Sequence, residues 1–283
     1  MFGYRSDGKK LKTVPAYFKL TPALMKTRND SEVFFKQDVE LSAMEEYINK
    51  QAEKGIKFSY MDIVYAAIIR VISQRPQLNR FVMNGRLYKR NSIFISLAVK
   101  KSHSDESDES TSKLEFNGTE NIFEIKEKLD KFVSDNKKED FDNSTDSFAK
   151  FLSKTPYFMI KAIVNFVWFL DNHGMCPKSI INLSPFHTSA FLTNVGSIGI
   201  DSIYHHIYNF GTTSLFLSMG KKKTSYIYED DELKKEKCIT IAFVGDERIC
   251  DGYYFANSFK LLSRLLTHPE MLEENVEKQE DCK

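Results

Sequence analysis

The sequence predicts a single mixed α/β domain in which helices cover a mixed sheet. Apolar residues recur at helical spacing in several segments, and short runs rich in β-branched and aromatic residues lie between them. The two patterns do not alternate regularly, so they indicate a mixed sheet and not the parallel sheet of a βαβ protein. Of the 283 residues, 42% are hydrophobic and 28% charged, which suffices for one large core and a solvated surface.

Two helices are predicted in the first third of the chain, over residues 43–54 and over residues 60–75. Each follows a serine that has an acidic residue three positions later, a capping box in which two residues satisfy each other's backbone amides. The first helix stops at Gly55, and Pro76 ends the second because its ring clashes with the preceding turn. The two boxes are Ser42 with Glu45 and Ser59 with Asp62.

A hairpin, a strand and a loop are predicted next. Asn84-Gly85 is the kind of dipeptide that takes the positive dihedral angles of a tight hairpin turn, and apolar runs flank it. Residues 92–99 are rich in β-branched and aromatic side chains, so we expect a buried strand there. Residues 102–112 have no large apolar side chain and much like charge, so burial cannot offset the entropy of ordering them. We therefore expect a mobile acidic loop over 102–112.

The rest of the chain predicts three more helices and four short strands. The apolar stretch 157–170 is shorter than the ~20 residues that cross a bilayer, so we expect a buried helix ending near residue 174. A final amphipathic helix covers about 253–266, before a proline. The other predicted elements are a helix over 120–135 and strands over 189–195, 213–219, 225–228 and 238–244.

Charge and terminal sequence exclude several classes of protein. Forty basic and 39 acidic residues leave a formal net charge of +1, too small to favour DNA or RNA as a partner. No apolar run follows the charges at the N-terminus, so we expect a cytoplasmic protein without a membrane partner. The four cysteines are widely scattered, which argues against a zinc site and against a disulfide framework.

One segment carries a specific motif. The predicted strand 239–244 runs into Gly245-Asp-Glu-Arg-Ile-Cys-Asp251-Gly252 and then into the final helix. This resembles the signature of the chloramphenicol acetyltransferase and dihydrolipoamide acyltransferase family, in which a histidine precedes Asp-Gly by four residues. Segments 75–82, 191–199 and 269–272 resemble other parts of the same family in the same order. Together the resemblance covers most of residues 14–272.

The resemblance implies a two-layer sandwich, with a mixed and mostly antiparallel sheet, and a homotrimer whose active sites lie between subunits. Such sites bind coenzyme A or acyl-coenzyme A and a small-molecule acyl donor or acceptor. In this family a histidine accepts the proton of the attacking thiol or hydroxyl, and a serine or threonine hydroxyl stabilises the oxyanion. By position, Glu247 replaces the histidine and Thr193 supplies the hydroxyl. Asp251, followed by Gly252, matches the structural aspartate of the family, which Arg28 is expected to hold.

The glutamate changes the expected chemistry. With reference pKa values of about 4.3 for Glu, 6.5 for His and 8.5 for a thiol, proton transfer to Glu costs about 3 kcal/mol more than transfer to His. That difference is on the order of a hundredfold in rate. An ionised carboxylate would also repel the thiolate that it creates, although burial can raise the pKa of a carboxyl group and recover part of the loss.

Other histidines and lysines near these segments have two interpretations each. His187 lies just before the strand of Thr193, so it either reaches the same channel as a base or is a loop histidine bonded to backbone groups. Lys221 and Lys222 either contact the phosphates of coenzyme A or form an ordinary exposed turn. The histidine pair 205–206 lacks the further ligands that a metal site would need.

The matched motif residues also have plainer interpretations. Asp251-Gly252 can be a helix boundary only, because Asp is a good N-cap and Gly eases a turn. Thr193 can be an ordinary strand residue, and Arg28 can be a solvated charge.

Two hypotheses for function follow, one from a binding class and one from an enzyme class. The first is an acyltransferase-like pseudoenzyme that binds a ligand or assembles, with weak or no acyl transfer. The second is an active coenzyme A-dependent acyltransferase with Glu247 or His187 as its base. A third, weaker hypothesis is a partner subunit of an active family member. We expect an N-terminal arm over 1–13, a charged C-terminal tail over 273–283, no metal and no lipoyl group on this chain.

Overall fold

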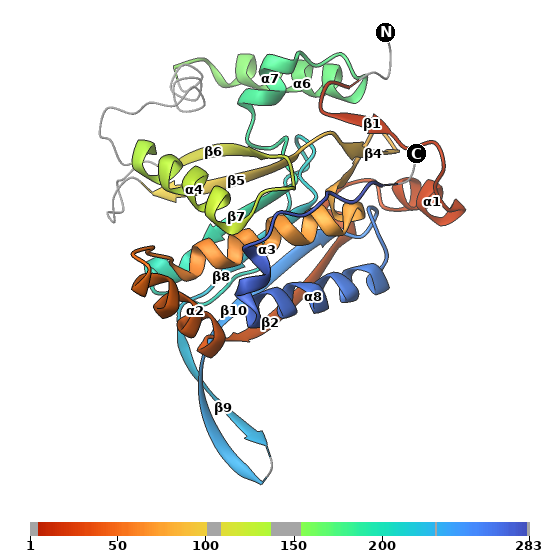
Figure 1. Cartoon of the computed structure of the whole chain (residues 1–283). Coiled ribbons are helices and arrows are strands. Elements are labelled where there is room, and N and C mark those ends of the chain that lie inside the picture. Colours follow the sequence, from red (N-terminus) through yellow and green to blue (C-terminus); the bar gives the residue numbers. More distant parts are fainter. Residues whose placement is uncertain (1–4, 101–108, 137–153, 230, 282–283) are drawn as a thin grey trace.

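Seven strands form one mixed sheet within the residues that the computed structural model describes, which are 5–100, 109–136, 154–229 and 231–281 (Figure 1). Strand β7 lies parallel to both of its neighbours, and the other strand pairs of this sheet are antiparallel. The predicted mixed, mostly antiparallel sheet is confirmed. In spatial order the strands are β2 (Glu32–Glu40), β10 (Glu232–Asp246), β8 (Leu215–Met219), β7 (Ala190–Asn194), β5 (Ile93–Lys100) and β6 (Glu109–Phe116), with β9 (Lys223–Glu229) paired to the first part of β10.

Four helices cover one face of this sheet, and α3 and α8 run side by side across it (Figure 1). Side chains alternate between the two faces of each strand, so Ile241 and Phe243 of β10 face the helices whereas Val244 faces the other way. On that second face, Val244 joins Phe191 and Phe216 in a smaller apolar cluster. The four helices are α2 (Ser42–Glu53), α3 (Tyr60–Gln74), α4 (Ile122–Asn136) and α8 (Gly252–Thr267).

A small second sheet joins the N-terminal arm to the hairpin that follows α3. Its strand order is β1 (Gly8–Lys10), β4 (Arg86–Arg90) and β3 (Arg80–Met83). The hairpin is confirmed: Asn84 and Gly85 both have positive φ, 47° and 65°. Such angles are accessible to Asn and Gly at low cost, which is why this dipeptide marks the turn. The other α-helices among the described residues are α1 (Ala16–Leu24), α6 (Tyr157–Asn172) and α7 (Lys178–Leu183).

One of the two predicted capping boxes forms. The Ser59 hydroxyl accepts from the Asp62 amide at 3.3 Å, and the Ser59 amide donates to Asp62 at 2.7 Å. The Ser42–Glu45 box was wrong, since α2 already includes Ser42 and its first turn has no side-chain cap. The Glu45 carboxylate instead accepts a hydrogen bond from the Tyr60 hydroxyl at 3.0 Å, a tertiary contact that local sequence does not reveal.

Part of the predicted acidic loop is a strand. Residues 109–112 belong to β6 and pair with β5, for example Glu109 with Lys100. Backbone hydrogen bonds to a neighbouring strand order this segment, so its polar composition was misleading. The rest of the loop, 102–108, lies outside the described residues.

Helix α6 is not the buried helix that its composition predicts. Phe158 and Phe166 are 71% and 61% exposed, and Asp171 is its one buried residue. The helix lies apart from the main sheet in Figure 1, and among the described residues no layer covers its outer side. An apolar composition predicts that a helix surface is buried. It does not predict whether the same chain or another molecule buries that surface. No described helix has the length and apolar character that crossing a bilayer requires.

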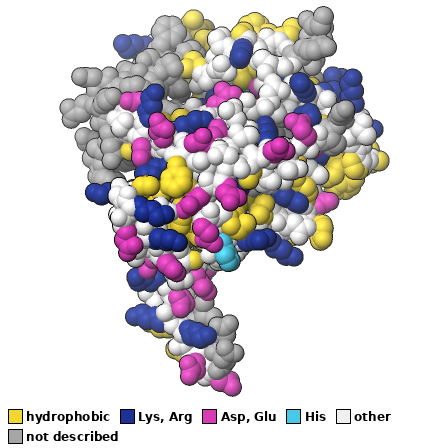
Figure 2. Space-filling model, viewed as in Figure 1, with side chains coloured by type: hydrophobic (Ala, Val, Ile, Leu, Met, Phe, Trp, Pro, Cys, Tyr) yellow, Lys and Arg dark blue, Asp and Glu magenta, His cyan; other side chains and the backbone are white. Residues whose placement is uncertain are grey.

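The first and the last of the described residues pack against the domain. The amide of Gln279 donates to Ser73 of α3 at 3.1 Å, and Asp281 binds Arg80 through both carboxylate oxygens at 2.6 Å. At the other end, Arg5 and Asp7 are buried as an ion pair at 2.9 Å. Charged groups of the expected arm and tail therefore contribute to the interior. On the face of the molecule that Figure 2 shows, acidic and basic side chains are interspersed.

Candidate active site

Glu247 lies in the turn between β10 and α8, half-buried. Its backbone amide donates to the carbonyl of Ser31 at 2.8 Å, which ties the turn to the start of β2. Its carboxylate forms no hydrogen bond or ion pair with any described residue. The turn therefore holds the backbone of Glu247 in place and leaves its side chain available to a ligand or to another chain.

The residues on either side of Glu247 lock the turn. Asp246 Oδ1 accepts from Arg248 Nε at 2.8 Å and from the Ser31 hydroxyl at 3.0 Å, and Asp246 Oδ2 accepts from Arg248 Nη2 at 2.7 Å. Both charged side chains are almost fully buried. Charge-assisted, two-point bonds of this kind fix geometry as well as energy. Sequence reasoning missed this pair, although charged residues at the end of an otherwise buried strand were a signal for it.

Arg80 adds a second support for the turn. Its Nη1 donates to the Ile249 carbonyl at 3.2 Å, while its Nε and Nη2 bind Asp281 near the C-terminus. The tail, Arg80 and the turn are thus linked by one guanidinium.

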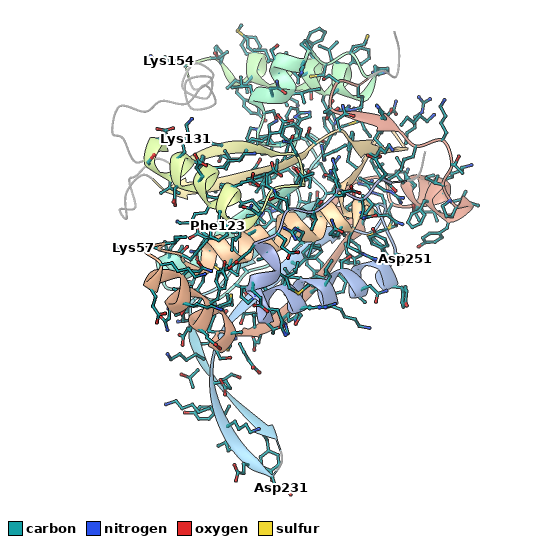
Figure 3. All side chains as sticks on the ribbon, viewed as in Figure 1. Lys57, Phe123, Lys131, Lys154, Asp231 and Asp251 are labelled. Atoms are coloured by element: carbon teal, nitrogen blue, oxygen red, sulfur yellow. The ribbon has the colours of Figure 1, made fainter. Side chains whose placement is uncertain are left out.

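Asp251 has the role of a helix cap. Its Oδ1 accepts from the Tyr254 amide at 2.7 Å, and it lies exposed at the N-terminal end of α8 (Figure 3). This is the helix-boundary interpretation of Asp251-Gly252. A Cβ added to Gly252 would meet no atom within 4 Å, so space does not require glycine there.

Arg28 does not hold Asp251, which corrects the expectation drawn from the resemblance. Its Nη1 donates to the Asn209 carbonyl at 2.8 Å and its Nη2 to the Val82 carbonyl at 3.0 Å. Arg28 is 5% exposed, so it is not a solvated charge either. Burial lowers its pKa to about 10, although the nearby Asp246 carboxylate acts in the opposite direction. Arg28 lies beside the Glu247 turn and not at the end of α8.

Thr193 lies near the end of β7 on the sheet face that the helices leave uncovered. Phe191, two residues earlier and therefore on the same face, belongs to the apolar cluster of that face. The Thr193 hydroxyl makes no hydrogen bond with the described residues, and the side chain is half-buried. Just beyond it, a Cβ on Gly196 would lie 2.5 Å from the Gly220 carbonyl, so glycine is needed for this close approach.

Thr193 and Glu247 of one chain are far apart. Leu215 pairs with both Ala190 of β7 and Gly245 of β10. Thr193 lies three residues beyond Ala190, in the direction in which β7 and β8 run. Glu247 lies two residues beyond Gly245, in the opposite direction, because β10 runs antiparallel to β8. Five residues at ~3.3 Å each separate them by roughly 16 Å along the strands. A single chain therefore does not bring the predicted hydroxyl and the predicted carboxylate together.

His187 is 1% exposed and both of its ring nitrogens have partners. Nε2 donates to Asp171 Oδ2 at 3.0 Å, and Nδ1 accepts from the Ser184 hydroxyl at 2.8 Å, the tautomer that an ionised Asp171 selects. Burial lowers the pKa of His187, against the opposing effect of Asp171. Arg5 pairs with the same aspartate at 2.6 Å. His187 thus belongs to a buried polar network and is inaccessible to a substrate.

The two candidate lysines for coenzyme A are exposed. The Nζ of Lys222 lies 4.1 Å from the centre of the Tyr60 ring, and Lys221 donates its backbone amide to Ile200 at 2.9 Å. Exposed basic side chains of this kind can contact a phosphate group, but they do not form a pocket that would hold it.

The adjacent histidines 205 and 206 lie in the segment between β7 and β8, which passes close to β2. His205 is half-buried with its ring stacked on Phe216 at 4.3 Å, and His206 is exposed. The next amide, of Ile207, donates to Glu32 at 2.5 Å. No group of three or more His, Cys, Asp or Glu side chains within the described part of the chain is arranged to hold a metal ion.

Comparisons with known proteins place this geometry in a known fold. The family model described as the catalytic domain of the 2-oxoacid dehydrogenases acyltransferase matches residues 182–273, which include Thr193 and Glu247. A probable dihydrolipoamide acetyltransferase from Listeria monocytogenes 4b F2365 has a TM-score of 0.58 at 13% identity, over 96% of this chain and 99% of its own. No curated protein matches the sequence.

Two further solved structures are similar. The dihydrolipoamide acetyltransferase of Azotobacter vinelandii has a TM-score of 0.57 at 13% identity, over 93% of this chain and 94% of its own. A chloramphenicol acetyltransferase has a TM-score of 0.55 at 11% identity, over 92% and 99%. At these identities the likeness concerns the fold. The predicted resemblance and the chloramphenicol-acetyltransferase-like α/β sandwich are confirmed.

Proposed function

We propose that this protein is an acyltransferase-like pseudoenzyme that binds a ligand or assembles with other chains, and that Glu247 has replaced its catalytic histidine. The observation that carries the proposal is the position of Glu247 in a turn locked by Asp246 and Arg248, with its carboxylate unpartnered among the described residues. The A. vinelandii enzyme was studied for the catalytic roles of a serine, a histidine and an asparagine, the last two four positions apart. Glu247 and Asp251 have the same spacing.

The exchange of imidazole for carboxylate supports the loss of activity. The unperturbed pKa of a glutamate side chain is about two units below that of a histidine side chain, which costs roughly a hundredfold in the rate of proton transfer. A negative carboxylate also opposes the negative charge that a deprotonated thiol brings. We therefore infer weak or no acyl transfer, with binding of coenzyme A or a similar ligand retained.

We propose that the site is completed between chains of a homotrimer. The separation of roughly 16 Å between Thr193 and Glu247 along the sheet supports this, because the Thr193 hydroxyl of one chain can then meet only the Glu247 carboxylate of another chain. Exposed apolar side chains offer surfaces for such assembly. They include Phe158, Phe166 and Phe169 of α6, together with Phe34, Ile198 and Ile203 near the uncovered sheet face.

An active coenzyme A-dependent acyltransferase with Glu247 as base is the alternative. The hydroxyl of Thr193, which has no partner among the described residues, favours it, since an oxyanion donor would be expected to remain unbound in the isolated chain. The burial of His187, with both nitrogens bonded, argues against that residue as the base. A stable complex with an active family member, and a cytoplasmic location, remain further proposals.

The experiment that tests the proposed function is an acyl-transfer screen. The wild-type protein and Glu247→Ala would be incubated with acetyl-coenzyme A and a set of thiol, hydroxyl and amine acceptors, and release of free coenzyme A would be measured. We expect both proteins to stay at the uncatalysed rate, whereas equilibrium dialysis detects bound coenzyme A. Robust transfer by the wild type that Glu247→Ala abolishes would establish the alternative.

A further inference from the structure

A cavity of about 310 Å³ opens beside the Glu247 turn, between the end of α1, the β3–β4 hairpin and the C-terminal end of α6. Its volume is at the lower end of the range for small-molecule sites. All of its charged lining residues are basic. The residues on which the argument depends are Lys26, Arg28, Asn84, Trp168, Asn209 and Arg248.

The buried charges behind this cavity do not balance. Asp246 pairs directly with Arg248 and is also the main countercharge of Arg28. One carboxylate thus serves two guanidinium groups. Within the described residues, the connected buried network contains four arginines and three aspartates. They are Arg5, Arg28, Arg90 and Arg248, against Asp7, Asp171 and Asp246. His187 also belongs to the network, but burial lowers its pKa, so it adds no charge that would offset the extra arginine, and the net charge of the network at neutral pH is positive.

Arg28 belongs to the positively charged network and also lines the cavity. Neutral carbonyls of Val82 and Asn209 accept from its two terminal nitrogens, and its Nε–H has no hydrogen-bond partner among the described residues. A buried donor without an acceptor destabilises the fold, because the hydrogen bond that it made to water in the unfolded chain is not replaced. Lys26 adds an exposed ammonium at the rim.

The other walls favour an organic group. Trp168 of α6 lines the cavity and is 40% exposed, so its indole ring offers an apolar surface that the protein does not cover. Asn84 and Asn209 add amide groups that both donate and accept.

We propose that this cavity binds a small organic anion whose carboxylate or phosphate lies against Lys26 and Arg28 and whose apolar part contacts Trp168. The anion neutralises the excess positive charge of the buried network. This proposal does not depend on acyl transfer at Glu247. Binding of the anion in the cavity requires no chemical step, and Glu247 is not one of the residues that line the cavity.

Trp168 is the single tryptophan of the chain, so its fluorescence reports directly on this cavity. The full-length protein would be titrated with hexanoate, with inorganic phosphate and with uncharged hexanol. We expect saturable changes in Trp168 emission with hexanoate or phosphate, weakened by added salt, and none with hexanol. Saturation by hexanoate alone identifies a carboxylate ligand, and saturation by phosphate alone identifies a phosphorylated one.

Charge reversal at the rim supplies the matched control. Lys26→Glu should weaken anion binding by about tenfold, since it removes one charge-assisted contact and adds repulsion. Lys57→Glu makes the same change at an exposed site on the opposite side of the molecule (Figure 3) and should leave the affinity unchanged. The proposal is wrong if neither anion gives a saturable change, or if the two variants bind the anion equally well.

Discussion

His187 donates a hydrogen bond to Asp171 across 3.0 Å, and the side chains of both residues are at most 1% exposed. Burial lowers the pKa of His187. Burial alone would raise the pKa of Asp171, but the bond from His187 and the charge of Arg5 outweigh it and lower that pKa. We therefore take the folded state at neutral pH to hold a neutral imidazole and an ionised carboxylate.

The stability of the protein should fall as the pH drops from about 7 to 5. An unfolded histidine takes up a proton near pH 6.5, whereas folded His187 resists it, so acid favours the unfolded state. The slope from this one group is at most about 1.4 kcal/mol per pH unit. A series of urea unfolding curves measures it, and His187→Gln should flatten the slope in this window. An unchanged slope in that variant would show that other groups cause the dependence.

Glu247→His should raise acyl transfer from acetyl-coenzyme A. The turn is locked by its neighbours, so an imidazole would enter a fixed position, with a gain of up to a hundredfold expected from basicity alone. Release of free coenzyme A measures the effect. Adding Thr193→Ala should remove most of the gain, because the oxyanion donor is then missing. A gain that survives the second change would contradict the proposed role of Thr193.

Asp246→Asn should destabilise the fold by about 3–5 kcal/mol, since it leaves buried Arg28 and Arg248 without their shared countercharge. Chemical denaturation measures the loss. Asp30→Asn makes the same chemical change at an exposed residue and should cost under about 0.5 kcal/mol. Equal losses in the two variants would rule out a special role for the buried pair.

Asp281→Asn should destabilise the fold and loosen the Glu247 turn together. Arg80 binds Asp281 and also donates to Ile249 in that turn, so weakening one contact frees the guanidinium from the other. Hydrogen exchange of the amides of 247–250 should become faster. Glu280→Gln, whose side chain is exposed, is the control and should leave the exchange rates unchanged. Exchange that is equally slow in both variants would show that the tail does not support the turn.

The double change Phe158→Ser and Phe166→Ser should weaken self-association without unfolding the chain, because both rings are exposed in one chain. Burial of each ring in an assembly would contribute about 1.5–3 kcal/mol. Sedimentation equilibrium measures the dissociation constant. Lys161→Ser on the same helix serves as the comparison. An unchanged constant in the double variant would exclude α6 from the assembly interface.

The sequence by itself determined the elements whose signals are local. The Ser59–Asp62 box, the Asn84-Gly85 turn and the Asp251 cap each act within a few residues, and all three are present in the structure. The order of the family motifs likewise predicted the sheet and the place of Glu247 between β10 and α8. These features depend on hydrogen bonds between near neighbours or on a linear pattern, so no knowledge of distant contacts was needed.

Only the tertiary structure decided which charges are buried together and which apolar surfaces stay exposed. Arg28 is hydrogen-bonded to Asn209, His187 to Asp171, and Glu45 to Tyr60. The partners are 181, 16 and 15 residues apart in the sequence. A charged side chain can be solvated, paired or buried, and the choice depends on the partner that folding brings near it. The same holds for α6, whose composition predicted burial although its own chain leaves it uncovered.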